Sequence, residues 1–143
     1  MRNKLNCVLL VDDNDSDNYL HKKVIEKAGI TDDIEIAENG QEALDFLQTR
    51  FAVEQEKHAS YEPILIFLDI NMPVMDGFEF LEEFQKLNDV AKGSTIIIML
   101  TSSTNPTEIS KAEKILGNGC FVHKPLTLAI IDDILQRYFS DNI

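Results

Sequence analysis

Four polar positions, each directly after an apolar run, carry the side chains that could do chemistry. They are Asp12-Asp13, Asp69, Thr101 and Lys124. The runs before Asp12, Asp69 and Thr101 have the length and composition of strands buried on both faces, as in a parallel sheet covered by helices, and the last run ends in His123 before Lys124. In open α/β sheets ligands collect outside the carboxyl ends of the strands. These side chains are therefore expected to meet in one cleft.

The chemistry of such a cleft follows from its charge. Three carboxylates close together in a partly desolvated site repel one another, so the site needs cations. Oxygen ligands without His or Cys select Mg²⁺ or Mn²⁺, Lys124 adds a second positive charge, and Thr101 adds a hydroxyl donor. The metal ion, the Lys124 ammonium and the Thr101 hydroxyl could together bind an anion with several oxygens. This arrangement predicts phosphoryl transfer onto Asp69 as nucleophile. Singly, such residues commonly cap helices or form surface ion pairs, and it is their combination and order that favour a site.

The elements that must position these side chains are five strands alternating with five helices. Apolar runs predict strands over 7–11, 34–37, 64–68, 95–100 and 120–123. Helical spacing predicts a helix between each strand and the next and one after the last, including helices that begin at Pro106 and after Thr127 as cap. The alternation implies an α/β fold: a doubly wound parallel sheet with helices on both faces and right-handed crossovers.

The sequence also predicts the ends and the inward faces of the first helices. In the first helix, Asp15 or Ser16 is expected as the cap, and Gly29 as the end. Its inward face is predicted from Leu20, Val24 and Ala28, and that of the second helix from Ala43, Leu44 and Leu47. The inward face of the third is predicted from Phe78, Leu81, Phe84 and either Leu87 or Asn88. Residues 48–62 fit a helix extension followed by a surface loop, which is long for such a connection.

Composition narrows the function further. The 143 residues suit a single domain over 1–143 with no output domain. The net charge of −12 opposes binding to nucleic acid or anionic lipid. No apolar run spans a bilayer and no leader pattern is present, so we expect a cytoplasmic protein. Cys7 and Cys120 are too few for a metal cluster or a redox pair, and are expected to be small buried thiols.

Four motifs together resemble the receiver domain of two-component response regulators, in the single-domain class that includes the chemotaxis regulator. They are Val11-Asp12-Asp13-Asn14, Leu68-Asp69-Ile70-Asn71-Met72-Pro73-Val74-Met75-Asp76-Gly77, Leu100-Thr101-Ser102 and Phe121-Val122-His123-Lys124-Pro125. The resemblance covers essentially the whole chain. It implies a flavodoxin-like fold with strand order 2-1-3-4-5. In that order Cys7 and Cys120 would lie about 14 Å apart, too far for a disulfide.

The resemblance also implies a role for each site residue. Asp69 would accept the phosphoryl group from a histidine kinase's phosphohistidine. Mg²⁺ (or Mn²⁺) would be held by Asp12, Asp13, Asp69 and the backbone carbonyl of Asn71. The phosphoryl oxygens would be bound by Thr101, Lys124 and the backbone of Ser102, which replaces the family's frequent Ala.

The resemblance implies roles for three further positions. The peptide bond before Pro125 is expected to be cis and to orient Lys124. Phe121 matches the family's aromatic switch, which turns inward as Thr101 moves toward the phosphate. Asn71 lies where the family tunes hydrolysis of its phosphoaspartate.

The implied function is a signalling switch, with only Mg²⁺-dependent self-phosphorylation and slow self-dephosphorylation as its own chemistry. The expected partners are a sensor histidine kinase or a histidine phosphotransfer protein. A downstream protein would bind the face made by the fourth helix, the fifth strand and the fifth helix, with the chain a monomer or a phosphorylation-dependent dimer. The length of 48–62 resembles the regulators that partner phytochrome-like or other hybrid sensor kinases.

Three other functions are compatible with parts of this pattern. A phosphorelay intermediate, which passes the group on to another His, has the same sequence features and stays open. An aspartyl-phosphate phosphatase generally needs a second acid two residues after the nucleophile, where this chain has Asn71. A flavin-binding module is disfavoured because Asp12-Asp13 would repel a phosphate at the first strand end.

Overall fold

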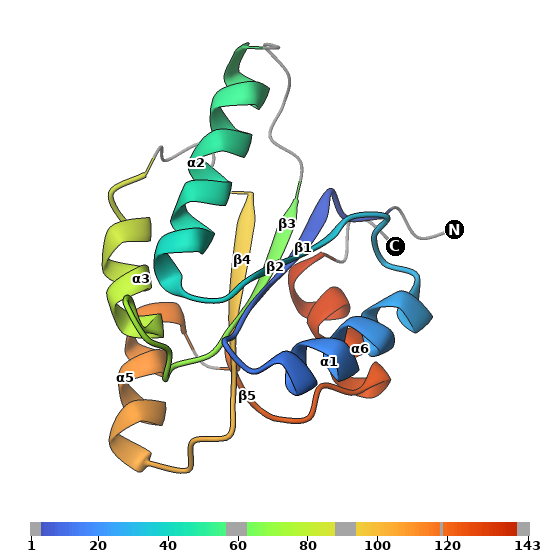
Figure 1. Ribbon diagram of the computed structural model, residues 1–143. Coiled ribbons are helices and arrows are strands. Elements are labelled where there is room, and N and C mark those ends of the chain that lie inside the picture. The colour runs from blue at the N-terminus through green and yellow to red at the C-terminus, as the bar shows by residue number, and fades with distance from the viewer. Residues whose placement is uncertain (1–3, 57–62, 88–93, 118, 140–143) are drawn as a thin grey trace.

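The architecture is a parallel sheet between two helical layers, seen in a computed structural model that describes residues 4–56, 63–87, 94–117 and 119–139. The sheet has the order β2-β1-β3-β4-β5 and all its pairings are parallel (Figure 1). Its strands are β1 (Cys7–Val11), β2 (Ile34–Ala37), β3 (Ile64–Leu68), β4 (Thr95–Thr101) and β5 (Phe121–His123). The predicted flavodoxin-like fold and strand order are confirmed.

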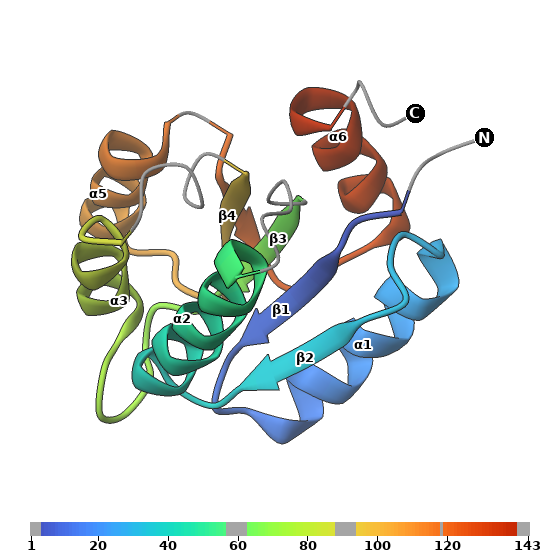
Figure 2. The same cartoon turned by 90° about the horizontal axis from the view of Figure 1, so that it is seen from above.

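The helices cover the sheet in two groups. They are α1 (Asp15–Ala28), α2 (Gly40–Glu56), α3 (Gly77–Phe84), α5 (Pro106–Leu116) and α6 (Leu128–Tyr138). Figure 2 shows α1 and α6 on one face and α2, α3 and α5 on the other. Every residue of β1 and of β3 is buried, as expected for strands covered on both sides. By contrast β2 lies at one edge and is partly exposed.

The helix ends depend on short polar side chains. Asn14, not Asp15 or Ser16, caps α1, because its side chain accepts from the Asp17 N–H. Gly29 ends that helix at φ 66°, as predicted, in the left-handed region that suits glycine. Thr127 caps α6, and Pro106 lies in the first turn of α5, both as predicted.

The predicted inward face of α1 is right only in part, because Val24 and Ala28 pack against the core but Leu20 is exposed. The helix buries Asn18, His21 and Ile25, whereas Leu20 is 57% exposed and Val24 and Ala28 are only partly buried. Asn18 can lie inside because its side-chain amide donates to the backbone carbonyl of Asp12 at 2.9 Å. A polar residue thus occupies the inner face where hydrophobicity alone indicated an apolar one.

The other helices follow their patterns more closely. The predicted inward residues of α2 are buried: Ala43, Leu44 and Leu47. This helix continues to Glu56 and also buries Phe51, which confirms a helix extension; residues 57–62 lie outside the described part of the chain. In α3 the prediction missed Phe80, which is fully buried and stacks on Phe84 with ring centroids 5.9 Å apart.

The cysteines and the lengths of the helices agree with the expectations from sequence. Both cysteines are buried and free. In the described residues, none of the helices has the length and apolar character needed to cross a bilayer.

Candidate functional site

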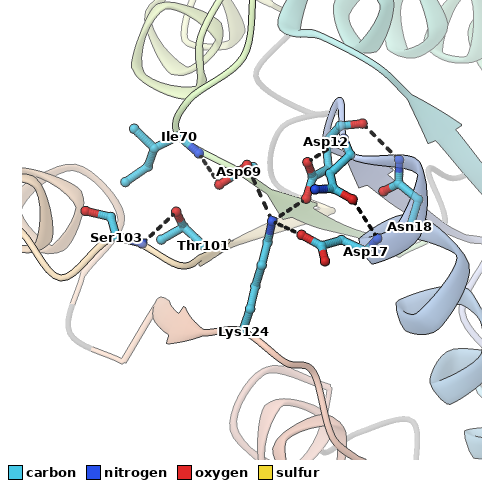
Figure 3. Close-up of polar contacts among 9 residues, drawn as sticks. Asp12, Asp17, Asn18, Asp69, Ile70, Thr101, Ser103 and Lys124 are labelled. Carbon is cyan, nitrogen blue, oxygen red and sulfur yellow. Dashed lines mark hydrogen bonds and ion pairs between the residues drawn. The ribbon is translucent and has the colours of Figure 1, made fainter.

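The strand ends bring the expected side chains to one edge of the sheet. Val11 and Leu68 are paired across β1 and β3, so Asp12 and Asp69, which follow them, are neighbours. The Asp69 N–H donates to the carbonyl of Val11 at 2.9 Å, and the Lys124 N–H donates to that of Thr101 at 2.9 Å. Sheet register therefore fixes the backbone of all four positions, and Figure 3 shows their side chains converging.

Lys124 is the central cation of this site. Its Nζ lies 2.6 Å from Asp12 Oδ2, 2.7 Å from Asp17 Oδ2 and 3.5 Å from Asp69 Oδ2 (Figure 3). The lysine side chain is only 12% exposed. Burial alone would lower the pKa of Lys124, but its hydrogen bonds to Asp12 and Asp17 and the charge of Asp69 raise that pKa well above its ordinary value. Lys124 is therefore a fixed positive charge.

Asp17 is the site residue that sequence reasoning missed. It belongs to the first turn of α1, and its N–H donates to Asn14 Oδ1 at 3.0 Å. The available signal was Asn14 as cap, which makes Asp17 the third helical residue and turns it toward the strand ends. With Asp15 or Ser16 as the cap, helical spacing gives Asp17 a different direction.

The acids form a set suited to a hard divalent cation. One carboxylate oxygen from each of Asp12, Asp13 and Asp69 lies within 4.8 Å of the others. Asp12 and Asp69 are buried and Asp13 is exposed, so the cluster has one open side. An all-oxygen set of this charge fits Mg²⁺ or Mn²⁺. Asn71 lies exposed in the loop after β3, and its carbonyl as a ligand stays a prediction.

The two oxygens of Asp69 have different surroundings. Its Oδ1 accepts from the Ile70 N–H at 2.9 Å, while Oδ2 is the atom nearest Lys124. Burial raises the pKa of Asp69 above its usual range, against the lowering effect of a hydrogen bond with Thr101; the nearby Asp12 charge adds to the rise and Lys124 opposes it. Burial thus makes the charged form of the Asp69 carboxylate less favourable than that of a surface Asp.

Thr101 and its neighbours approach from β4. Thr101 is fully buried, and its Oγ1 accepts from the Ser103 N–H at 3.2 Å. Ser102 is exposed at the start of the following loop. The site therefore has a hydroxyl on the opposite side of Asp69 from Asp12 (Figure 3).

The remaining predicted residues lie on the segment around β5. The peptide bond between Lys124 and Pro125 is cis, as the resemblance implies. Phe121 is half-buried against the core under α2, α3 and α5, and its ring meets that of His123 edge-on at 5.4 Å. Its role as a switch stays a prediction.

A parallel sheet in this order, with acids, a threonine and a lysine gathered at its carboxyl edge, defines a flavodoxin-like domain with an acidic strand-end site. Residues 8–136 match the response regulator receiver domain. The chain therefore belongs to the receiver domain family of two-component signalling.

Individual relatives agree with this. The chemotaxis protein CheY of Halobacterium salinarum is 33% identical over 90% of the chain and 95% of that protein. Hybrid signal transduction histidine kinase G of Dictyostelium discoideum is 32% identical over 92% of the chain, which spans only 3% of that kinase.

Two solved structures share the fold over nearly the whole chain. A two-component response regulator from Cytophaga hutchinsonii has a TM-score of 0.79 at 28% identity and covers 96% of this chain and 98% of its own. The phosphorylated cyanobacterial phytochrome response regulator RcpA has a TM-score of 0.71 at 25% identity, with 97% of each chain covered.

Proposed function

We propose that the chain is a phosphorylation switch that takes a phosphoryl group onto Asp69 from a histidine kinase or a histidine phosphotransfer protein. The observation that supports this most directly is the position of Lys124 Nζ, which lies against Asp12 and 3.5 Å from Asp69 Oδ2. An ammonium and a carboxylate this close at a strand end suit charge neutralisation during phosphoryl transfer. RcpA, a neighbour of the same fold, is described as phosphorylated.

Asp69 Oδ2 is the proposed nucleophile. Because Oδ1 already accepts from the Ile70 N–H, the carboxylate is oriented with Oδ2 toward Lys124. In the transfer, a bond forms between Oδ2 and phosphorus while the donor's P–N bond breaks, and the imidazole nitrogen leaves with that electron pair. Lys124 and the Thr101 hydroxyl would bind the phosphoryl oxygens, with the backbone of Ser102 alongside.

Asp12, Asp13 and Asp69 would hold the divalent cation, with the carbonyl of Asn71 as a further ligand. When bound, Mg²⁺ would neutralise charge on the transferring group. Before that, the three acids need a compensating cation, and Lys124 supplies part of that charge in the structure.

The phosphorylated form would be recognised through the face of α5, β5 and α6. A new negative charge beside Thr101 and Lys124 biases the segments that carry them. Thr101 ends β4 and Lys124 follows β5, and the two strands are paired there. Phe121, at the start of β5, would turn inward with Thr101, and a partner protein would bind the altered face.

Asp69→Asn tests the acceptor. With acetyl phosphate and MgCl₂, the wild-type protein should gain one phosphoryl group, labile in acid and in base, by intact mass, and Asp69→Asn should gain none. The matched control is Asp45→Asn, the same change at an exposed acid on α2. Labelling of Asp69→Asn at the wild-type level would overturn the proposal.

A further inference from the structure

Asp17 is an acid at this site to which the proposed phosphoryl transfer assigns no role. Lys124 Nζ lies 2.7 Å from Asp17 Oδ2, but 3.5 Å from Asp69 Oδ2. Hydrogen bonds between an ammonium and a carboxylate have lengths of about 2.7–2.9 Å. Lys124 is therefore bonded to Asp17 as well as to Asp12, and is only near the proposed acceptor (Figure 3).

The capping of α1 fixes the position of Asp17. Its N–H donates to Asn14 Oδ1, and the Asn14 N–H in turn donates to Asp12 Oδ1, each at 3.0 Å. The same short turn therefore presents Asp12 and Asp17 to one ammonium. The Asp17 carboxylate that meets Lys124 is therefore carried on a short side chain from a backbone position fixed by this turn.

Asp17 forms an ion pair with Lys124 and is not one of the three clustered acids that would hold the divalent cation. The acids whose oxygens cluster within 4.8 Å are Asp12, Asp13 and Asp69. The Asp17 side chain lies at the outer side of Lys124, where it is 32% exposed while the lysine is 12% exposed. A change at Asp17 therefore alters the surroundings of Lys124 while leaving these three acids in place.

We propose that Asp17 is a positioning residue that competes with the phosphoryl group for Lys124 and so restrains phosphorylation of Asp69. This inference rests on the proposed function. A lysine ammonium has three N–H donors, and in the structure three carboxylates surround it. An arriving phosphoryl oxygen must draw the ammonium away from Asp17, and the Asp17 charge also repels the incoming anion.

The test compares rates of phosphoryl uptake from a small donor, so that kinase docking plays no part. With phosphoramidate at saturating MgCl₂, the P–N bond breaks, the Asp69 Oδ2–P bond forms, and ammonia leaves after taking up a proton. Asp17→Asn should be phosphorylated roughly fivefold faster than the wild type, the order expected for a partly exposed ion pair. Intact mass spectrometry measures the rate.

Two further variants separate this role from a general effect of charge or folding. Asp15→Asn removes the same charge from the same helical turn at an exposed position, and should keep the wild-type rate. Asp17→Glu restores the carboxylate and should return the rate toward that of the wild type. Calorimetry with beryllium fluoride, which mimics a phosphoryl group, should show roughly fivefold tighter binding to Asp17→Asn at equal thermal stability.

The outcomes are distinct. An Asp17→Asn rate equal to that of Asp15→Asn, or slower than the wild type, overturns the role of Asp17 and leaves phosphorylation of Asp69 intact. Failure of every protein, the wild type included, to gain a phosphoryl group contradicts the proposed function itself.

Discussion

At the scale of single residues, the site is a balance between buried acids and one ammonium. Asp12 is 5% exposed and Asp69 is 8% exposed, and both face Lys124. A buried carboxylate without a compensating charge destabilises the folded state. Removing one partner of a buried ion pair leaves the other charge buried and uncompensated. Lys124 is therefore a stabilising residue as well as a proposed ligand of the phosphoryl group.

Replacing Lys124 by Met tests this balance. Without a divalent cation, Lys124→Met should lose about 3 kcal/mol of unfolding free energy, because the acids at the strand ends lose their ammonium. Added Mg²⁺ should then raise the Tm of the variant more than that of the wild type, since the cation replaces the missing charge. Thermal denaturation followed by far-UV circular dichroism, in EDTA and in MgCl₂, measures both effects.

The control for that change is Lys86→Met. Lys86 is exposed and pairs with Glu83 one helical turn away, so its loss should change the Tm little and leave the Mg²⁺ response as it was. If Mg²⁺ stabilised Lys124→Met and the wild type equally, the ammonium would not be compensating the acids that the cation approaches.

The sequence was enough to predict the residues at the strand ends but not Asp17. Asp12, Asp69, Thr101 and Lys124 could be placed because parallel strands of one sheet end at one edge. The direction of Asp17 depends on where α1 begins, and each residue of a helix turns by about 100°. The start at Asp15, set by the Asn14 side chain, could not be distinguished from a start one or two residues later by residue type alone.

At the scale of elements, the position of Asp69 depends on the close approach of the first residue of α3 to the segment that follows β3. The Gly77 N–H donates to the carbonyl of Ile70 at 2.8 Å, which folds the loop back onto the strand end. A Cβ at Gly77 would collide with the carbonyl oxygen of Asp69 and lie 3.0 Å from Ile70 Cα. Both are backbone atoms, so no side chain can move aside to make room.

Gly77→Ala should therefore disturb the acceptor as well as the fold. Overpacking of this kind costs about 1–3 kcal/mol of unfolding free energy, and the displaced backbone would carry Asp69 with it. We expect a lower urea midpoint and a phosphorylation rate at least about tenfold below the wild type, since small displacements of reacting groups are costly. Urea unfolding and phosphoryl uptake from acetyl phosphate provide the two measurements.

Gly117→Ala separates the two effects. Gly117 has φ 97°, so alanine is strained there, yet nothing lies within 4 Å of the added Cβ. It should lose about 1 kcal/mol of stability and keep the wild-type phosphorylation rate. Equal rates for Gly77→Ala and Gly117→Ala would show that the contact between α3 and β3 does not position Asp69.

The elements differ in how well their patterns could be interpreted. Buried parallel strands are continuous apolar runs, so β1 and β3 were predicted with their observed bounds. The buried face of a helix is harder to predict from the sequence where that face includes polar residues. Asn18 is buried because it binds a backbone carbonyl of the strand end, a tertiary contact that helical spacing does not encode. Phe80 was missed because both Phe78 and Phe80 are aromatic and only packing selects between them.

At the scale of the whole molecule, one sheet separates two cores. The first lies under α2, α3 and α5 and includes Phe80; the second lies under α1 and α6 and includes Ile131. Side chains of β3 alternate between them, with Ile64, Ile66 and Leu68 in the first and Leu65 and Phe67 in the second. Because β3 is shared, neither layer can separate without exposing the strand that carries Asp69.

This arrangement predicts one cooperative unfolding transition whichever core is weakened. Phe80→Ala should cost about 3–5 kcal/mol and Ile131→Ala about 2–5 kcal/mol, since both side chains are fully buried. Far-UV circular dichroism and amide hydrogen exchange in urea should give coincident midpoints for each variant, and Val53→Ala, at a partly exposed position on α2, should stay near the wild type. A variant that lost protection in only one layer, with the other still protected, would contradict a shared strand as the source of cooperativity.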